Sequence, residues 1–224
     1  MNTEKDINQL TSLLMRSVSP FHCVLAASRF LEQKGFTRLD LTDAWDLKPE
    51  QGYYLPVFDS SLIAFTTGEN CICKTAPGGA PLSPAPVPAL RMEAAHTDWP
   101  CLKLKPSPEV STSRYGKLNV EVYGSPILST WMDRPLSLAG KVCAAGETPF
   151  SPSVHIVDIK RPVAVIPNLA IHMNREVNSG VALNPQKDML PILTLLGENT
   201  DKDHCLVNLL ARETGCAPEE ILDY

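Results

Sequence analysis

The stretch KLNVEVYG, residues 117–124, alternates apolar and polar side chains, with Leu118, Val120 and Val122 in the apolar positions. Residues two apart on a strand point to the same side of a sheet, so the alternation predicts a strand with one buried face. Similar short patterns occur nearby, in CLKLK (101–105), SVHIVDI (153–159) and PVAVIP (162–167). We therefore predict that the region from 101 to 167 is mostly antiparallel sheet with one face in the core.

Upstream of this region, the first 35 residues are predicted to form two helices. Ser19 can cap the second helix, Pro20 suits its first position and Gly35 ends it. Apolar residues recur at helical spacing before and within it: Leu10, Leu13 and Leu14, then Val24, Ala27, Phe30 and Leu31.

From about Gly52 the pattern changes to short β-prone runs. YYLPVF and SLIAFTT predict a hairpin that turns at residues 59–61. Residues 68–90 are rich in proline, glycine, alanine and serine and predict a loop, and Leu90–Ala95 predicts a further strand. Further along, helices are expected at Met189–Leu196 and His204–Glu213. Two units are expected, with a change near residue 100.

Composition sets limits on the class of protein. The chain has 224 residues, 44% hydrophobic and 20% charged, which is enough apolar material for a real core. Its formal charge of −5 argues against nucleic acid and anionic membranes as partners, because both attract cationic surfaces. No apolar run approaches the length of a membrane-spanning helix, and the start, MNTEKDINQL, lacks the pattern of a secretion signal. We expect a cytoplasmic protein.

The seven cysteines are an odd number and are scattered, which favours reduced thiols over a disulfide framework. Cys71 and Cys73 form a CxC pair, but no CxxC pair and no suitably spaced histidine accompany it. Because a structural zinc site needs four ligands, buried or loop thiols are the preferred interpretation.

The tripeptide His96-Thr97-Asp98, in EAAHTDWP, is the most informative candidate site. If these residues lie at a strand end, His96 and Asp98 point the same way, so the imidazole can bind a metal while the carboxylate orients it. An ordinary hydrogen-bonded pair is the alternative, since HxD occurs by chance in many proteins.

Several further segments carry a resemblance to a known family. HTDWPCLKLKP resembles the HTDSPCLKLKP segment of the aspartyl and vacuolar aminopeptidase I family of zinc metallopeptidases. Four other segments are similar to family segments and follow the family's order: SPFHCVLAASRFLEQKGF, YYLPVFDSSLIAFTTGEN, VEVYGSPILSTWMDRPLSLAGKV and IKRPVAVIPNLAIHMNREVNSGVALNPQKDMLPIL. The likeness runs from about residue 4 to the end.

The resemblance implies an α/β fold: part of a zinc-exopeptidase α/β domain with an inserted β-rich dimerisation (lid) domain. On that basis residues 1–101 form the N-terminal part of the metallopeptidase domain and residues 102–215 the insert. Residues 216–224 then return toward the second part of the metallopeptidase domain.

The resemblance also implies a dinuclear zinc enzyme that removes N-terminal residues, often acidic ones, from peptides, and that forms homo-oligomers through the insert. His96 matches a terminal zinc ligand and Asp98 its orienting carboxylate, counted with the catalytic residues. His172, in AIHMNR, matches a histidine that acts in the active site of a neighbouring subunit.

The remaining family ligands and the Glu-Glu pair that contains the general base follow the region matched here. Glu219-Glu220 precedes that point and does not match the pair; Asp201, Asp203 and His204 are better explained as the start of a helix. We therefore expect one zinc ligand from this chain and no peptidase activity from the 224 residues alone. The alternative is a non-catalytic truncated homologue that acts as an assembly or regulatory module.

Overall fold

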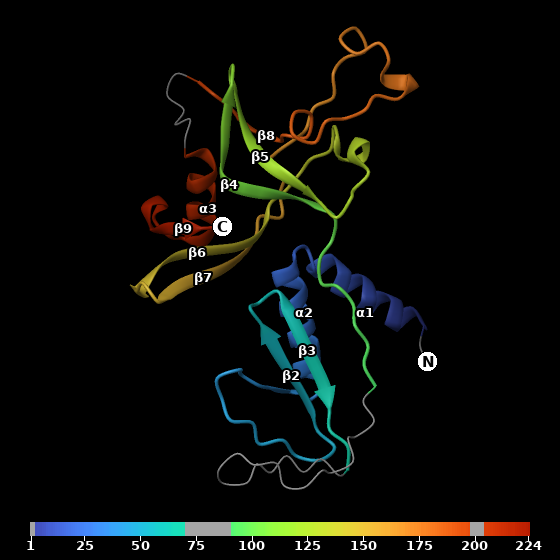
Figure 1. Cartoon of the computed structure of the whole chain (residues 1–224), viewed down its shortest axis with the longest axis vertical. Helices are drawn as coiled ribbons and strands as arrows, with labels where there is room; N and C mark the ends of the chain where they lie inside the picture. The colour runs from blue at the N-terminus through green and yellow to red at the C-terminus, as the bar shows by residue number, and fades with distance from the viewer. Residues whose placement is uncertain (1–2, 70–90, 198–203) are drawn as a thin grey trace. The chain divides into compact units, whose positions relative to one another are not determined.

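The computed structural model describes residues 3–69, 91–197 and 204–224. The chain separates into two compact units, Met1–Asp98 and Trp99–Tyr224 (Figure 1). The first unit contains helices and a small sheet, and the second contains two small sheets and a helix. No helix in the described ranges is both long and apolar enough to cross a membrane.

The first unit begins with helices α1 (Thr3–Arg16) and α2 (Pro20–Gln33). As predicted, Ser19 caps α2, because its hydroxyl accepts a hydrogen bond from the backbone N–H of His22 at 3.4 Å. The backbone of Gly35 then takes a φ of +83°, a left-handed conformation that glycine adopts without steric cost. Both predicted helices are thus confirmed.

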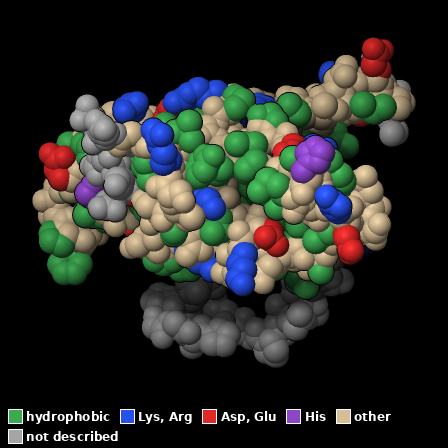
Figure 2. All heavy atoms as spheres, turned by 90° about the horizontal axis from the view of Figure 1, so that it is seen from above, with side chains coloured by type: hydrophobic (Ala, Val, Ile, Leu, Met, Phe, Trp, Pro, Cys, Tyr) green, Lys and Arg blue, Asp and Glu red, His purple; other side chains and the backbone are tan. Residues whose placement is uncertain are grey.

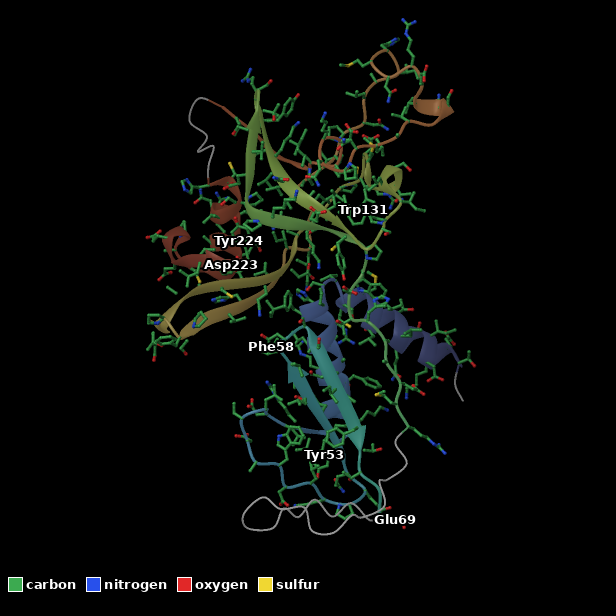
Figure 3. The ribbon with its side chains drawn as sticks, viewed as in Figure 1. Tyr53, Phe58, Glu69, Trp131, Asp223 and Tyr224 are labelled. Carbon is green, nitrogen blue, oxygen red and sulfur yellow. The ribbon has the colours of Figure 1, made fainter. Side chains whose placement is uncertain are left out.

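A three-stranded sheet completes the first unit: β1 (Thr37–Arg38), β2 (Gly52–Val57) and β3 (Ser61–Thr66). β1 runs parallel to β2, and β2 pairs with β3 in the predicted antiparallel hairpin. Phe58 and Asp59 turn the hairpin with φ values of +51° and +60°, and the Phe58 side chain is exposed at the tip (Figure 3).

Tyr54, on β2, is the most deeply buried side chain of this unit, with no exposed surface. Its hydroxyl donates a hydrogen bond to the Glu32 carboxylate at the end of α2, so it joins the helix to the sheet. Burial, followed by this contact with Glu32, raises the pKa of the Tyr54 phenol from 10.0 to about 12.

The raised pKa predicts how the first unit responds to alkali. The phenol ionises near pH 10 in the unfolded chain but near pH 12 in the folded one, so its stabilising contribution is complete below pH 10 and is lost as the pH rises to 12. We expect the free energy of unfolding to fall by roughly 1–3 kcal/mol over this interval because of Tyr54. Urea titrations at each pH should show that this fall in the free energy of unfolding is absent in Tyr54→Phe and present in Tyr53→Phe. Equal pH dependence of stability in the two variants would contradict the assignment.

The second unit contains two three-stranded sheets, and their strands are β4 (Cys101–Thr112), β5 (Tyr115–Tyr123), β6 (Ala139–Thr148), β7 (Ser151–Asp158), β8 (Ile192–Leu195) and β9 (Ile221–Asp223). One sheet has the order β4-β5-β8 and the other β7-β6-β9, with antiparallel pairing in both. The strands predicted from CLKLK, KLNVEVYG and SVHIVDI are confirmed as β4, β5 and β7. Strand β6 lies within the region predicted to be mostly antiparallel sheet, although no segment was named for it, and β9 was not predicted.

The predicted helix before Gly215 is confirmed as α3 (Cys205–Thr214), and its Leu206 and Leu210 join the core of the second unit. Side chains of β5, β6 and β7 supply most of the rest of that core: Leu118, Val120, Val142 and Val157. The side chain of Glu109 on β4 accepts a hydrogen bond from the backbone N–H of Leu206 at 2.6 Å and so caps the start of α3. The described residues of this unit also form three short 3₁₀ helices, η1 (Leu128–Trp131), η2 (Val177–Ser179) and η3 (Pro218–Glu220).

Three predicted elements are wrong. Met189–Leu196 is not a helix, because the residues after Pro191 pair with β5 as strand β8. PVAVIP makes only single bridges, because Ala164 pairs with Leu136 while Val165 pairs with Ile192.

The strand expected at Leu90–Ala95 is the third error. Residues 91–95 are irregular and exposed, and they make no strand pairing with any described residue, whereas a strand needs a partner for its backbone groups. Other expectations, for the loop at 70–90, the Cys71–Cys73 pair, Leu90, Asp201 and Asp203, lie outside the described residues.

Candidate functional site

The candidate site lies on the irregular segment that follows residue 95, at the end of the first unit. The strand from which the His96–Asp98 geometry was predicted is absent, yet the structure brings the two side chains together. Nδ1 of His96 lies 2.8 Å from the backbone oxygen of Asp98 and 3.1 Å from its carboxylate Oδ1. The irregular segment therefore brings His96 and Asp98 into contact without the predicted strand.

Thr97, between the two, anchors the segment to the hairpin. Its hydroxyl donates a hydrogen bond to the backbone oxygen of Ser60 at 2.8 Å, across 37 residues of sequence. Ser60 closes the hairpin loop in which Phe58 and Asp59 have left-handed backbones, so the loop conformation presents that oxygen. The sequence analysis did not identify this contact, because nothing in the sequence pairs a turn residue with a threonine so far away.

The contacts of His96 determine which ring nitrogen is available. A backbone carbonyl oxygen only accepts hydrogen bonds, so Nδ1 must be the donor and carry the hydrogen. In the neutral ring, Nε2 then holds the lone pair. The His96 side chain is 77% exposed and that of Asp98 27%, so the ring can meet a ligand while the carboxylate is partly enclosed.

This arrangement fits one position of a metal site. Histidine ligands in metalloproteins commonly donate their second ring N–H to a carboxylate or backbone carbonyl, which fixes the tautomer and orients the ring. Both kinds of acceptor face Nδ1 of His96 here. Within the described ranges, however, no group of three or more histidine, cysteine, aspartate or glutamate side chains is placed to hold a metal ion.

His172 lies in the second unit, on a segment that we call the arm. The arm comprises residues 168–190 and lies between β7 and β8 in the sequence. Figure 1 shows this orange segment extending away from the strands of its unit. His172 is exposed in a turn in which the N–H of Met173 bonds to the oxygen of Ala170 at 2.8 Å.

The base of the arm is held by Asp133, which has a φ of +57°. Its backbone N–H bonds to the oxygen of Ile166, and its carboxylate accepts from the N–H of Asn168, both at 2.8 Å. Asp133 therefore fixes where the arm starts, although the sequence analysis gave it no role.

Two other histidines and Glu220 have partners close to them in their own units. His22 bonds through Nδ1 to the Ser19 hydroxyl at 2.8 Å, in keeping with a packed role at the start of α2. His155 contacts Ser153 and Cys216. Glu220 is engaged locally, where its carboxylate accepts from the N–H of Ala217 at 2.7 Å.

Comparison with known proteins places the chain in a family. The family model described as aminopeptidase I zinc metalloprotease (M18) matches residues 13–224. A probable M18 family aminopeptidase 2 from Clostridium acetobutylicum is 42% identical over 217 residues, which cover 96% of this chain and 47% of the relative. The chain thus spans about half the length of the curated relatives it matches.

Solved structures agree. A chain in the cryo-EM structure of the Ape4 and Nbr1 complex is 30% identical, with a TM-score of 0.77 over 96% of this chain and 42% of that one. The mApe1 dodecamer of S. cerevisiae is 19% identical, with a TM-score of 0.70 over 100% of this chain and 48% of that one, which shows a shared fold. The predicted mixed α/β class is confirmed at this level, as is the resemblance found in the sequence, and the chain belongs to the M18 family of aminopeptidase I zinc metalloproteases.

Proposed function

We propose that this chain supplies part of a zinc-dependent aminopeptidase that removes N-terminal residues, with a preference for acidic ones, from peptides. The observation that carries the proposal is the contact of His96 Nδ1 with the backbone oxygen and the carboxylate Oδ1 of Asp98, in a chain of a zinc aminopeptidase family. A negatively charged chain suits a peptide substrate better than nucleic acid or a lipid surface. The odd, scattered cysteines favour a reducing compartment, and we propose the cytoplasm.

In this proposal His96 is a zinc ligand through Nε2, and Asp98 is the residue that orients it. Asp98 keeps the hydrogen on Nδ1 and strengthens the donor character of the other nitrogen. Thr97 holds the segment against the hairpin so that the ring keeps its direction. Zinc, two ions per complete site, would activate water and polarise the scissile carbonyl.

The 224 residues alone are proposed to be inactive. A catalytic zinc generally takes three protein ligands, and the described residues contain no group of three histidine, cysteine, aspartate or glutamate side chains placed to hold one. The other ligands and the general base would come from the metallopeptidase segment that relatives carry beyond the matched half.

Residues 102–215 are proposed to be the inserted domain through which subunits associate. The related yeast mApe1 is a dodecamer, which supports assembly, and so do the apolar side chains that reach the surface of the second unit between charged groups (Figure 2). Large examples are Ile127, Phe150, Leu169, Met173 and Leu195. We accordingly expect the isolated chain to be oligomeric or poorly soluble.

His172 is proposed to act in the partner subunit's active site. Its exposed place on the arm, held at its base by Asp133, is suited to reaching beyond its own subunit. A ring N–H of His172 can donate a hydrogen bond to the negative oxygen that develops on the scissile carbonyl, an interaction that strengthens in the transition state.

Zinc binding by the chelator-washed 224-residue chain tests the ligand assignment. We expect less than one zinc retained per chain, because a single histidine holds the ion weakly. Calorimetric titration should show that His96→Ala removes this binding, while the matched variant His22→Gln leaves it in place because the His22 ring is engaged with Ser19. Tight binding of two zinc ions per chain would overturn the proposal.

An assembly or regulatory module is the second candidate function. It is favoured by the lack, in the described parts of the chain, of a three-ligand group. The two candidates differ in what His96 does: a module assembles normally with His96→Ala, and no activity of the assembly depends on that residue.

A further inference from the structure

A cysteine and a histidine of the second unit, Cys216 and His155, face each other. Sγ of Cys216 lies 3.5 Å from Nε2 of His155, and the same nitrogen lies 3.0 Å from the hydroxyl of Ser153. Cys216 is 61 residues from His155 in sequence, so the pairing is a product of the fold.

The β7 strand places the two polar partners on one side. Ser153 and His155 are two apart and therefore point to the same face. Across the sheet they pair with Ala144 and Val142, and both of these β6 residues are buried. This is the face that packs toward the core, so the imidazole lies at the edge of the core rather than on the outer surface.

The chain following α3 brings the thiol to that edge. Gly215 ends the helix with a φ of +75°, and its N–H bonds to the oxygen of Ala211 at 2.9 Å. The N–H of Cys216 then bonds to the hydroxyl of Thr214 at 3.4 Å. Two hydrogen bonds donated by backbone N–H groups, one to a backbone oxygen and one to a side-chain hydroxyl, therefore hold the backbone of Cys216 against the end of α3.

Reagents can reach the pair, since both Cys216 and His155 are partly exposed. Two carboxylates of α3 and η3 are engaged elsewhere: Glu213 with the Arg161 guanidinium at 2.7 Å, and Glu220 with the N–H of Ala217. Among the described residues, Nε2 of His155 has the Cys216 thiol and the Ser153 hydroxyl as its hydrogen-bond partners, and neither is a carboxylate.

We propose that Cys216 is a modification site, a nucleophilic thiol assisted by His155, for small disulfides of the glutathione class. Nε2 of His155 takes the proton of the thiol as Sγ attacks one sulfur of the disulfide. A new S–S bond forms between Cys216 and that half, the original S–S bond breaks, and the other half leaves as a thiolate that takes up the proton. One disulfide is consumed and one is formed, so no further oxidant is needed.

Two other described cysteines serve as internal controls. Cys143, on the adjacent β6, and Cys23, on α2, are also partly exposed, but neither has a histidine contact among the described residues. If exposure alone set the rate, all three thiols would react alike.

The test is the rate of modification of each cysteine in the intact 224-residue chain, measured by peptide mass spectrometry with oxidised glutathione and, separately, with iodoacetamide. We expect Cys216 to react about tenfold faster than Cys143 and Cys23, because an imidazole neighbour activates a thiol. His155→Gln should bring Cys216 down to the rate of Cys143 and leave the other two rates unchanged. In urea, all three should react equally.

The unchanged rates of Cys143 and Cys23 in His155→Gln report that the variant is folded, and Ser153→Ala provides a second, milder change that should keep the fast reaction. Equal native rates at Cys216 and Cys143 would overturn the proposal. So would a folded His155→Gln chain in which Cys216 stays fast.

Discussion

Mixing two inactive variants is expected to restore activity. The variants are His96→Ala and His172→Ala, each made in a completed chain, in which residues 1–224 are continued by the segment of the C. acetobutylicum relative that follows the matched stretch. Each variant alone is expected to be inactive, because every site in it lacks either the zinc ligand or the histidine from the partner.

The size of the recovery follows from how the sites are shared. An intact site needs His96 from a His172→Ala subunit and His172 from a His96→Ala partner. With equal amounts and free exchange, about one quarter of the sites meet both conditions, whatever the size of the assembly, if the pairs form at random between two symmetric faces. We therefore expect about a quarter of the activity of the unmutated completed chain.

Exchange itself must be verified, for example by purifying mixed assemblies through two different affinity tags. A mixture that contains such assemblies and stays as inactive as either parent would show that His172 does not act in trans. Activity of His172→Ala on its own would show that the residue only shapes its turn, the interpretation that its local hydrogen bonds also permit.

The largest effect on stability is expected from Leu206→Ala. Leu206 has no exposed surface and sits where α3 meets the core formed by β5, β6 and β7. Removing a fully buried leucine costs the lost burial and leaves a cavity, so the free energy of unfolding of the second unit should fall by about 3 kcal/mol.

The matched control is Leu222→Ala, since Leu222 is 64% exposed on β9. Its replacement should change the stability by less than about 0.5 kcal/mol. Hydrogen exchange resolved by peptide separates the two units, and the loss in Leu206→Ala should be confined to peptides after residue 98. A similar loss in both variants would mean that α3 does not anchor the core.

Local sequence signals explain the parts of the fold that were predicted correctly. The Ser19-Pro20 start of α2 and the alternation in β5 depend on neighbours in sequence, and such signals identify an element wherever it packs. The buried face of α2 shows the limit. Small residues, Ala26 and Ser28, are buried there, while Phe30 of the predicted apolar stripe is 43% exposed.

The errors share a different cause, which is that a strand exists only with a partner. β8 forms because the edge of β5 accepts it, although its residues were predicted as a helix. Residues 91–95 make no strand pairing with a described residue and stay irregular, and none of their side chains is of the β-branched or aromatic kind that is common in strands. Pairing partners are distant in sequence and cannot be read from a local pattern.

In the candidate site, too, the sequence predicted contacts between neighbouring residues and missed those between distant ones. The pairing of His96 with Asp98 follows from two residues of one short motif, and the structure brings them together. The contacts of Thr97 with Ser60 and of Cys216 with His155 join residues 37 and 61 positions apart, and only the folded chain reveals them.

The central claim, that this chain contributes a zinc-binding half to an aminopeptidase, is tested most directly by the zinc content and peptidase activity of the completed chain. We predict two zinc ions per chain and release of single N-terminal residues from peptides, fastest for acidic ones, with zinc binding reduced and activity lost in His96→Ala. The 224 residues alone should release none. A folded completed chain that binds two zinc ions and cleaves peptides equally well with His96→Ala would contradict the account.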